Sequence, residues 1–187
     1  MSINVLVPVA DGTEELEVVA IVNILRRAGA HVVIAGIKNK TITAARGVRL
    51  IADNNLLDCM DVSYDLIALP GGVPGVEHLK ESKELVELLR KQFQTDKMIG
   101  AICAAPQVVL AFHGILGHQR ATGHPAFTED IPNKESLDQR VVVDKNLVTS
   151  RGAGTAVEFA LKLVELLFGR AKAIKVADAI VAIPGIV

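Results

Sequence analysis

The chain has 187 residues, half of them hydrophobic, and a formal net charge of −1 at pH 7. This length suffices for one well-buried core and is short for two, so we expect a single domain over residues 1–187. Because basic and acidic residues are interspersed along the chain, nucleic-acid binding is not indicated.

Two cysteines, Cys59 and Cys103, cannot build a disulfide framework. No apolar run reaches membrane-spanning length, and no basic-then-apolar leader is present. We therefore expect a cytoplasmic protein that does not enter the membrane. With one Tyr and no Trp, the core must consist of small aliphatic residues, which suits parallel strands covered by helices on both faces.

The first half of the chain alternates strands and helices. A strand, helix, strand unit requires a parallel pair with a right-handed crossover. Thr13 is the expected N-cap of the first helix, with Glu14 and Glu15 in its first turn and Gly29 at its end. In chain order we expect a strand at 3–9, a helix from about 13 to 28, a strand at 31–36, a small hairpin outside the main sheet at 41–44 and 48–52, and a strand at 65–69.

The second half continues the same pattern, so the fold class is α/β with a mostly parallel central sheet. Here we expect an amphipathic helix at 81–94, a buried strand at 98–102, a helix at 104–111, loops over 113–133, paired short strands at 141–143 and 147–149, a glycine turn at 150–155, helices at 156–168 and 170–181, and an apolar tail to 187.

Cys103 falls at the corner between the strand at 98–102 and the helix that follows. Small residues, among them Gly100 and Ala104, surround it and permit a sharp bend, as in a nucleophile elbow. A helix N-terminus at that corner would favour the thiolate form. The alternative is an inert packed cysteine, because free cysteine is among the most buried residue types.

Two further features share the rim at the carboxyl ends of the parallel strands. Residues 70–75, PGGVPG, carry glycines whose N–H groups, at Gly71 and Gly72, can face a ligand or an oxyanion, although such a cluster can also be an ordinary turn. Glu17 lies among apolar residues of the first helix, which favours a protonated acid that donates to the Cys103 sulfur. A solvated first-turn acid is the alternative for Glu17.

Five ordered segments, ADGTEELE, LPGGVPG, AICAAP, TGHP and TSRGAGTAVEFAL, carry a resemblance that covers essentially the whole chain. The sequence resembles the ThiJ/PfpI superfamily and, within it, the branch of DJ-one, the protein deglycase, and YajL. This resemblance implies a flavodoxin-like three-layer sandwich and a homodimer. It implies neither a cofactor nor a metal.

The resemblance also implies roles for single residues. Cys103 corresponds to the nucleophile, Glu17 to its protonated partner, and Gly72 and Ala104 to the oxyanion N–H donors. His124 corresponds to a histidine near the cysteine, with a structural or dimer-contact role as the alternative.

Two arginines match the superfamily, and two other positions differ from it. Arg46 and Arg151 match arginines that could hold an anionic group or an oxidised sulfur, with surface or interface pairing as the alternative. Ile51 replaces a cysteine and Asn23 replaces an aspartate, which puts the roles of those two positions in doubt. Cys59 has no motif around it and is expected to be structural.

Three functions remain open from the sequence. The leading hypothesis is a cofactor-free enzyme whose Cys103 attacks methylglyoxal or glyoxal, as a glyoxalase does, or their early adducts on proteins and nucleotides, as a deglycase does. The second is a sensor of oxidative stress or a chaperone whose Cys103 oxidises to a sulfinate. The third is a cysteine peptidase-like hydrolase, which would need a histidine oriented by a carboxylate.

Overall fold

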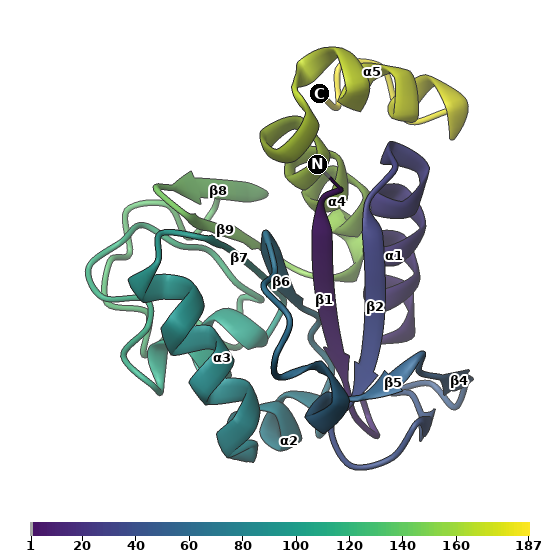
Figure 1. Ribbon diagram of the computed structural model, residues 1–187. Helices are drawn as coiled ribbons and strands as arrows, with labels where there is room; N and C mark the ends of the chain where they lie inside the picture. Colours follow the sequence, from purple (N-terminus) through teal and green to yellow (C-terminus); the bar gives the residue numbers. More distant parts are fainter. Residues whose placement is uncertain (1) are drawn as a thin grey trace.

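The computed structural model describes residues 2–187, and its centre is a seven-stranded sheet in the order β5-β2-β1-β6-β7-β9-β8 (Figure 1). Every neighbouring pair is parallel except β8 and β9, so the expected mostly parallel sheet is confirmed. The strands are β1 (Asn4–Val9), β2 (His31–Gly36), β5 (Asn54–Asn55), β6 (Leu66–Leu69), β7 (Met98–Ile102), β8 (Val141–Asp144) and β9 (Leu147–Ser150).

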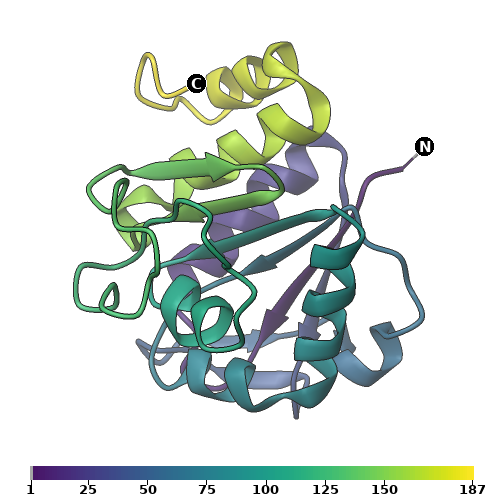
Figure 2. The same ribbon diagram turned by 90° about the vertical axis from the view of Figure 1, so that its left-hand side faces the viewer.

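Helices cover both faces of the sheet, which confirms the three-layer arrangement (Figure 2). One face carries α1 (Glu15–Ala28) and α4 (Ala156–Phe168), with α5 (Arg170–Ala179) packed on both. The other face carries α2 (Gly75–Glu81), α3 (Lys83–Gln94) and the helix η2 (Pro106–Ala111). Two short 3₁₀ turns complete the set, η1 (Leu56–Cys59) and η3 (Ala153–Thr155).

The alternation of side chains along the buried strands builds two cores. In β1, Val5 and Val7 pack with α1 and α4, whereas Leu6 packs on the opposite side with α2 and α3. Burial of each side chain of this size stabilises the fold by about 1.5–3 kcal/mol. Gly100 of β7 leaves room for Phe159 of α4, because a Cβ there would lie 2.9 Å from the Phe159 ring. The strands are therefore held from both sides.

The start of α1 differs from the expectation. The helix begins at Glu15, and Thr13 is not its N-cap, because the Thr13 hydroxyl accepts the Ala10 N–H at 3.0 Å and closes the preceding turn instead. Glu14 occupies the cap position without a capping side-chain hydrogen bond. The helix ends at Gly29 as predicted, with φ of 99°.

The region between β6 and β7 contains two helices where one was expected. The sequence did not predict α2, and the amphipathic helix starts at Lys83 rather than at residue 81. Ser82 separates the two helices, because its hydroxyl accepts the Leu85 N–H at 3.2 Å and caps α3.

The hairpin of β3 (Thr41–Thr43) and β4 (Arg49–Ile51) forms an antiparallel two-stranded sheet of its own, as expected. It lies outside the main sheet, so its position depends on contacts with neighbouring loops and with α1.

The outer edge of β2 is occupied by side chains as well as by β5. The short strand β5 pairs only with the end of β2, at Ala35 and Gly36. Further along the edge, Asp53 accepts the Ile34 N–H at 2.9 Å and Arg26 donates to the Val32 carbonyl at 2.8 Å. Arg26 and Asp53 also pair with each other at 2.8 Å.

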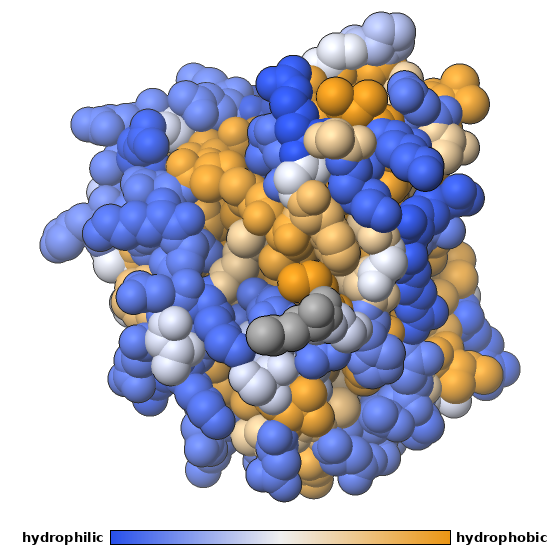
Figure 3. Space-filling view, turned by 45° about the horizontal axis from the view of Figure 1, so that its top comes forward, coloured by the Kyte–Doolittle hydropathy of each residue, from blue (hydrophilic) through white to orange (hydrophobic). Residues whose placement is uncertain are grey.

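Apolar side chains also reach the surface, at the end of the molecule that carries α5 and both chain termini (Figures 1 and 3). In the C-terminal segment Val181 and Ile183 are 90% and 77% exposed. Within residues 2–187, no helix combines the length and the apolar character needed to cross a bilayer.

Candidate active site around Cys103

Cys103 sits directly after β7 in a conformation that few non-glycine residues adopt. Its φ is +65°, in the left-handed region, which costs about 1–2 kcal/mol for a residue with a Cβ. The surrounding backbone holds this bend, because the Cys103 N–H donates to the Ser150 carbonyl at 3.0 Å and its carbonyl accepts the His124 N–H at 2.8 Å. The predicted strand-to-helix corner is therefore present.

The helix after the corner is not the regular α-helix that the sequence indicated. It is a π-helix over Pro106–Ala111, and the Phe112 N–H donates to the Gln107 carbonyl at 3.2 Å, five residues back. Pro106 supplies no N–H to a regular ladder, and wide turns of this kind often occur at functional sites.

Glu17 reaches the Cys103 sulfur from α1. Its side chain is fully buried, and its Oε2 accepts the Gly71 N–H at 2.6 Å, while Oε1 has no protein partner. The carboxyl and the Cys103 thiol lie on either side of Gly71, because a Cβ there would be 3.0 Å from Glu17 Oε2 and 3.1 Å from Cys103 Sγ. The structure therefore places the predicted acid near the predicted nucleophile.

The glycine turn after β6 closes the site on a third side. A Cβ at Gly71 would lie 2.5 Å from the Cys103 Cβ and 3.0 Å from Glu17 Oε2, so no side chain fits there. Gly72 has φ of +91°, and its N–H and that of Ala104 both lower the pKa of the Cys103 thiol. The two predicted N–H donors therefore stabilise negative charge on the predicted nucleophile.

Burial shifts the pKa values of both ionisable groups upward. Burial first, and the Glu14 carboxylate second, raise the pKa of Glu17 to about 7 against the opposing effect of the Gly71 N–H. Burial and the charge of Glu17 raise the pKa of Cys103 to about 12, although the N–H groups of Gly72 and Ala104 lower it. This direction is opposite to the one expected from the corner alone, because burial and a neighbouring carboxylate outweigh the N–H donors.

Near neutral pH these pKa values leave Cys103 as a thiol and place Glu17 between its neutral and ionised forms. When Glu17 is ionised, its charge opposes ionisation of Cys103. With the proton on Glu17, that opposition disappears and the carboxyl can donate to a thiolate. Formation of the nucleophile therefore depends on Glu17 being neutral.

A pocket of about 480 Å³ opens onto the sulfur. It brings together five of the residues that the sequence singled out, and Cys103 itself is only partly buried. These residues are Glu17, Arg46, Cys103, His124 and Arg151.

Arg140 lines the pocket but was not singled out in the sequence, whereas Glu14, expected in the first turn of the first helix, lines it as well. Val141 pairs with Ser150 across the antiparallel strands β8 and β9. One residue beyond this pair in each strand, the same register places Arg140 near Arg151. The register of the predicted short strands was the signal that could have identified Arg140.

His124 lies at the pocket but does not complete a catalytic triad. Its Nδ1 accepts the Ala126 N–H at 3.2 Å, so that nitrogen cannot donate to an orienting carboxylate. Within residues 2–187 no hydrogen bond joins the ring to the Cys103 thiol. The backbone of His124, which binds the Cys103 carbonyl, has the clearer part in the site.

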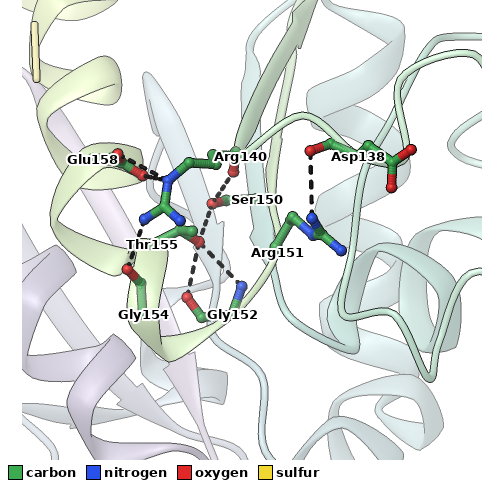
Figure 4. Close-up of polar contacts among 8 residues, drawn as sticks. All are labelled: Asp138, Arg140, Ser150, Arg151, Gly152, Gly154, Thr155 and Glu158. Carbon is green, nitrogen blue, oxygen red and sulfur yellow. Dashed lines mark hydrogen bonds and ion pairs between the residues drawn. The ribbon is translucent and has the colours of Figure 1, made fainter.

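The two arginines next to β9 are held differently (Figure 4). Arg140 donates to both carboxylate oxygens of Glu158, at 3.0 and 2.7 Å, and to the Gly154 carbonyl at 3.0 Å. Arg151 points the other way and makes one long bond, 3.3 Å, to the Asp138 carbonyl. Arg140 therefore braces the loop at 150–155, whereas Arg151 keeps most of its donors free.

The described part of the chain, residues 2–187, contains no cluster of three or more His, Cys, Asp or Glu side chains arranged to hold a metal ion. The chemistry available at the pocket is that of the thiol, the buried carboxyl, the N–H donors and the arginines.

Comparison with protein-family models matches residues 3–166 to the DJ-1/PfpI family. The chain belongs to the DJ-1/PfpI family. It is 46% identical over 177 residues to protein DJ-1 homolog B of Arabidopsis thaliana, covering 94% of this chain but only 40% of that protein. The chain thus spans less than half the length of that family member.

Other members of the DJ-1/PfpI family match over nearly their whole length. Glutathione-independent glyoxalase DJR-1.2 of Caenorhabditis elegans is 40% identical over 170 residues, covering 90% of this chain and 89% of that protein. The solved structure of oxidised Toxoplasma gondii DJ-1 superposes with a TM-score of 0.93 at 40% identity, covering 97% of this chain and 99% of that one. Family and fold are therefore those that the sequence motifs indicated.

Proposed function

We propose that this protein is a cofactor-free enzyme in which Cys103 attacks methylglyoxal or glyoxal, or the early adducts that these aldehydes form on amines of proteins and nucleotides. The observation that carries the proposal is the strained Cys103 bend, with its sulfur beside the buried Glu17 carboxyl and open to a pocket. The name of the Caenorhabditis elegans relative supports a glyoxalase-type activity.

The proposed reaction needs no oxidant and no metal. The sulfur forms a bond with the aldehyde carbon, and the oxyanion is stabilised by N–H donors of Gly72 and Ala104 before it takes a proton. Glu17 then removes the proton from the carbon that bears sulfur and returns it to the neighbouring carbon, which gives a thioester of a hydroxy acid. Water cleaves the thioester, releasing lactate or glycolate and the free thiol. With a hemiaminal adduct as substrate, the carbon–nitrogen bond breaks as the carbon–sulfur bond forms, the thiol proton goes to the departing amine, and the same hemithioacetal results.

Single-turnover kinetics test the covalent step. We expect Cys103→Ser to abolish conversion of free methylglyoxal and of a preformed adduct freed of aldehyde. If the wild-type protein converts only the adduct, the deglycase version is supported. If it converts only the free aldehyde, the glyoxalase version is supported. Clearance of both substrates by Cys103→Ser at the wild-type rate would contradict the proposal.

A redox role is the second candidate, and one observation favours it. The partly buried Cys103 faces a pocket with free guanidinium donors on Arg151, which suits a sulfinate, and the similar Toxoplasma gondii structure is described as oxidised. Peroxide titration followed by intact mass would support this role by a stable gain of two oxygens at Cys103, with protection of a client protein rising in parallel. If oxidation of Cys103 by two oxygens abolished both turnover and client protection, the redox role would be contradicted.

The peptidase-like alternative has less support. It requires a histidine that is oriented by a carboxylate, and the Nδ1 of His124 is occupied by the Ala126 N–H.

Assembly as a homodimer in the cytoplasm is part of the same proposal. Leu16 and Val19 of α1 are about half exposed, at 52% and 54%, and with Val157 they line an open apolar hollow of about 650 Å³. Such a contiguous apolar face is typical of an interaction surface. We expect Val19→Asp to shift the mass in solution from dimer to monomer, as measured by light scattering, and an unchanged mass would contradict dimerisation through this face.

A further inference from the structure

The hairpin of β3 and β4 is fastened to the loop and helix start that carry Glu17. This hairpin belongs to a separate sheet, so among residues 2–187 no strand of the main sheet pairs with it. Backbone and side-chain bonds to residues 11–15 do so instead. They run from the Gly12 N–H to the Thr43 carbonyl (2.8 Å), from the Thr43 N–H to Asp11 Oδ1 (2.7 Å), from the Ala45 N–H to the Thr13 carbonyl (2.9 Å), and from the Arg46 N–H to Glu15.

The bond between Arg46 and Glu15 is made at the tip of this hairpin. Both Glu15 oxygens accept the Arg46 N–H, at 3.0 and 3.1 Å, and the Glu15 side chain is 9% exposed. Burial alone would raise the pKa of Glu15, but N–H groups including those of Arg46 and Val48, together with the charge of Arg46, bring it below its usual value, so the carboxylate stays ionised. A charged acceptor makes this a strong attachment.

The guanidinium of Arg46 is left free by the same arrangement. Arg46 lines the Cys103 pocket, and within residues 2–187 its guanidinium makes no hydrogen bond or ion pair. Glu15 does not line that pocket, although Glu17, two residues later on α1, does. One turn of helix therefore carries the carboxyl that faces the sulfur and the carboxylate that holds the hairpin tip.

We propose that Glu15 is a positioning residue, whose carboxylate holds the hairpin turn by the Arg46 N–H and so keeps the Arg46 guanidinium at the mouth of the Cys103 pocket. The positive charge held there makes the pocket selective for reagents and substrates that carry a negative charge near the group attacked. The inference rests on the proposed function only in taking Cys103 as the attacking group.

Alkylation of Cys103 measures this charge without any turnover. Iodoacetate is an anion and iodoacetamide is neutral, so the ratio of their rate constants reports the potential at the sulfur. Peptide mass identifies Cys103 as the modified thiol, since Cys59 is buried. We expect Arg46→Ala to lower the iodoacetate to iodoacetamide ratio about threefold at low salt, and less at high salt.

Substitutions at the neighbouring Glu14 and Glu15 should change the iodoacetate to iodoacetamide ratio in opposite directions. Glu14 lines the pocket and binds no hairpin N–H with its side chain, so Glu14→Ala removes a repelling charge and raises the ratio. Glu15→Ala removes the same charge but releases Arg46, and we expect the ratio to fall about as far as with Arg46→Ala. In the Arg46→Ala background, Glu15→Ala should lower it no further.

Hydrogen exchange of the peptide at 44–48 should speed up in Glu15→Ala, and cooperative thermal unfolding checks that the variant folds. If it does not fold, Glu15→Gln is compared with Glu14→Gln, and the Glu15 variant should again give the lower ratio. A ratio that rises or stays unchanged in the Glu15 variant overturns the positioning role. That outcome would leave the Cys103 chemistry standing, whereas an active Cys103→Ser would overturn the proposed function and leave these ratios as they are.

Discussion

Replacing Glu17 by Gln tests directly whether the Glu17 charge raises the pKa of Cys103. Gln is always neutral, so Glu17→Gln removes the charge that opposes ionisation of Cys103 while keeping the size of the side chain. A unit charge in close contact contributes about 4 kcal/mol at the effective dielectric of a protein, which is about 3 pKa units. The pKa of Cys103 should therefore fall below its wild-type value of about 12, by at most that amount, because burial, the largest cause of its elevation, remains in the variant.

The thiolate absorbance in the ultraviolet, followed against pH, gives this pKa. Cys59→Ser removes the second thiol from both proteins, and Glu14→Gln, which removes a charge that is not bonded to the sulfur, should shift the titration far less. Alkylation should become faster in Glu17→Gln, whereas turnover of carbonyl substrates should fall, because an amide cannot carry a proton between carbons. A thiol pKa that stays the same or rises in Glu17→Gln would refute the reasoning.

Three further predictions concern stability and packing. The pKa of Glu17 is about 7 in the folded chain against 4.5 for the free group, so the folded state holds this proton more tightly. The contribution of Glu17 to stability is therefore fully present below pH 4.5 and is lost as pH rises to 7. Denaturant titrations should show wild type losing about 3 kcal/mol relative to Glu17→Gln over that interval, and parallel curves would contradict it. Gly71→Ala should lower the melting temperature and block alkylation of Cys103, because its Cβ would overlap the Cys103 side chain. Gly154→Ala, whose Cβ would meet no atom within 4 Å, should leave the melting temperature and the alkylation unchanged. Equal effects of the two substitutions would refute the steric argument. Arg140→Met and Glu158→Gln should each cost about 0.5–1 kcal/mol in thermal unfolding, and the double variant little more than either alone; full additivity would show that the pair is not coupled.

The sequence predicted the placement of the site better than its chemistry. The strands that end at Val9, Leu69 and Ile102 are buried apolar runs, and their parallel order alone brings the following turns to one rim. Small residues around Cys103 indicated the bend, and the apolar setting of Glu17 indicated a carboxyl that resists ionisation.

What sequence patterns could not supply depends on tertiary contacts. The hydroxyls of Thr13 and Ser82 are equivalent as caps in the sequence, and the contacts of each decide which of them starts a helix. Helix-forming residues do not distinguish a π-helix from an α-helix at 106–111. The pKa of Cys103 depends mainly on how deeply the thiol is buried, which no local pattern encodes.

The side chains that occupy the outer edge of β2 have a consequence for the molecule in concentrated solution. An open strand edge offers a row of unpaired N–H and carbonyl groups on which a strand from another molecule can add, and this is a common route to aggregates. Arg26 and Asp53 already bind the Val32 carbonyl and the Ile34 N–H, and they carry charge into the position that an incoming strand would need. Growth of fibrils from this edge would first require that ion pair to break.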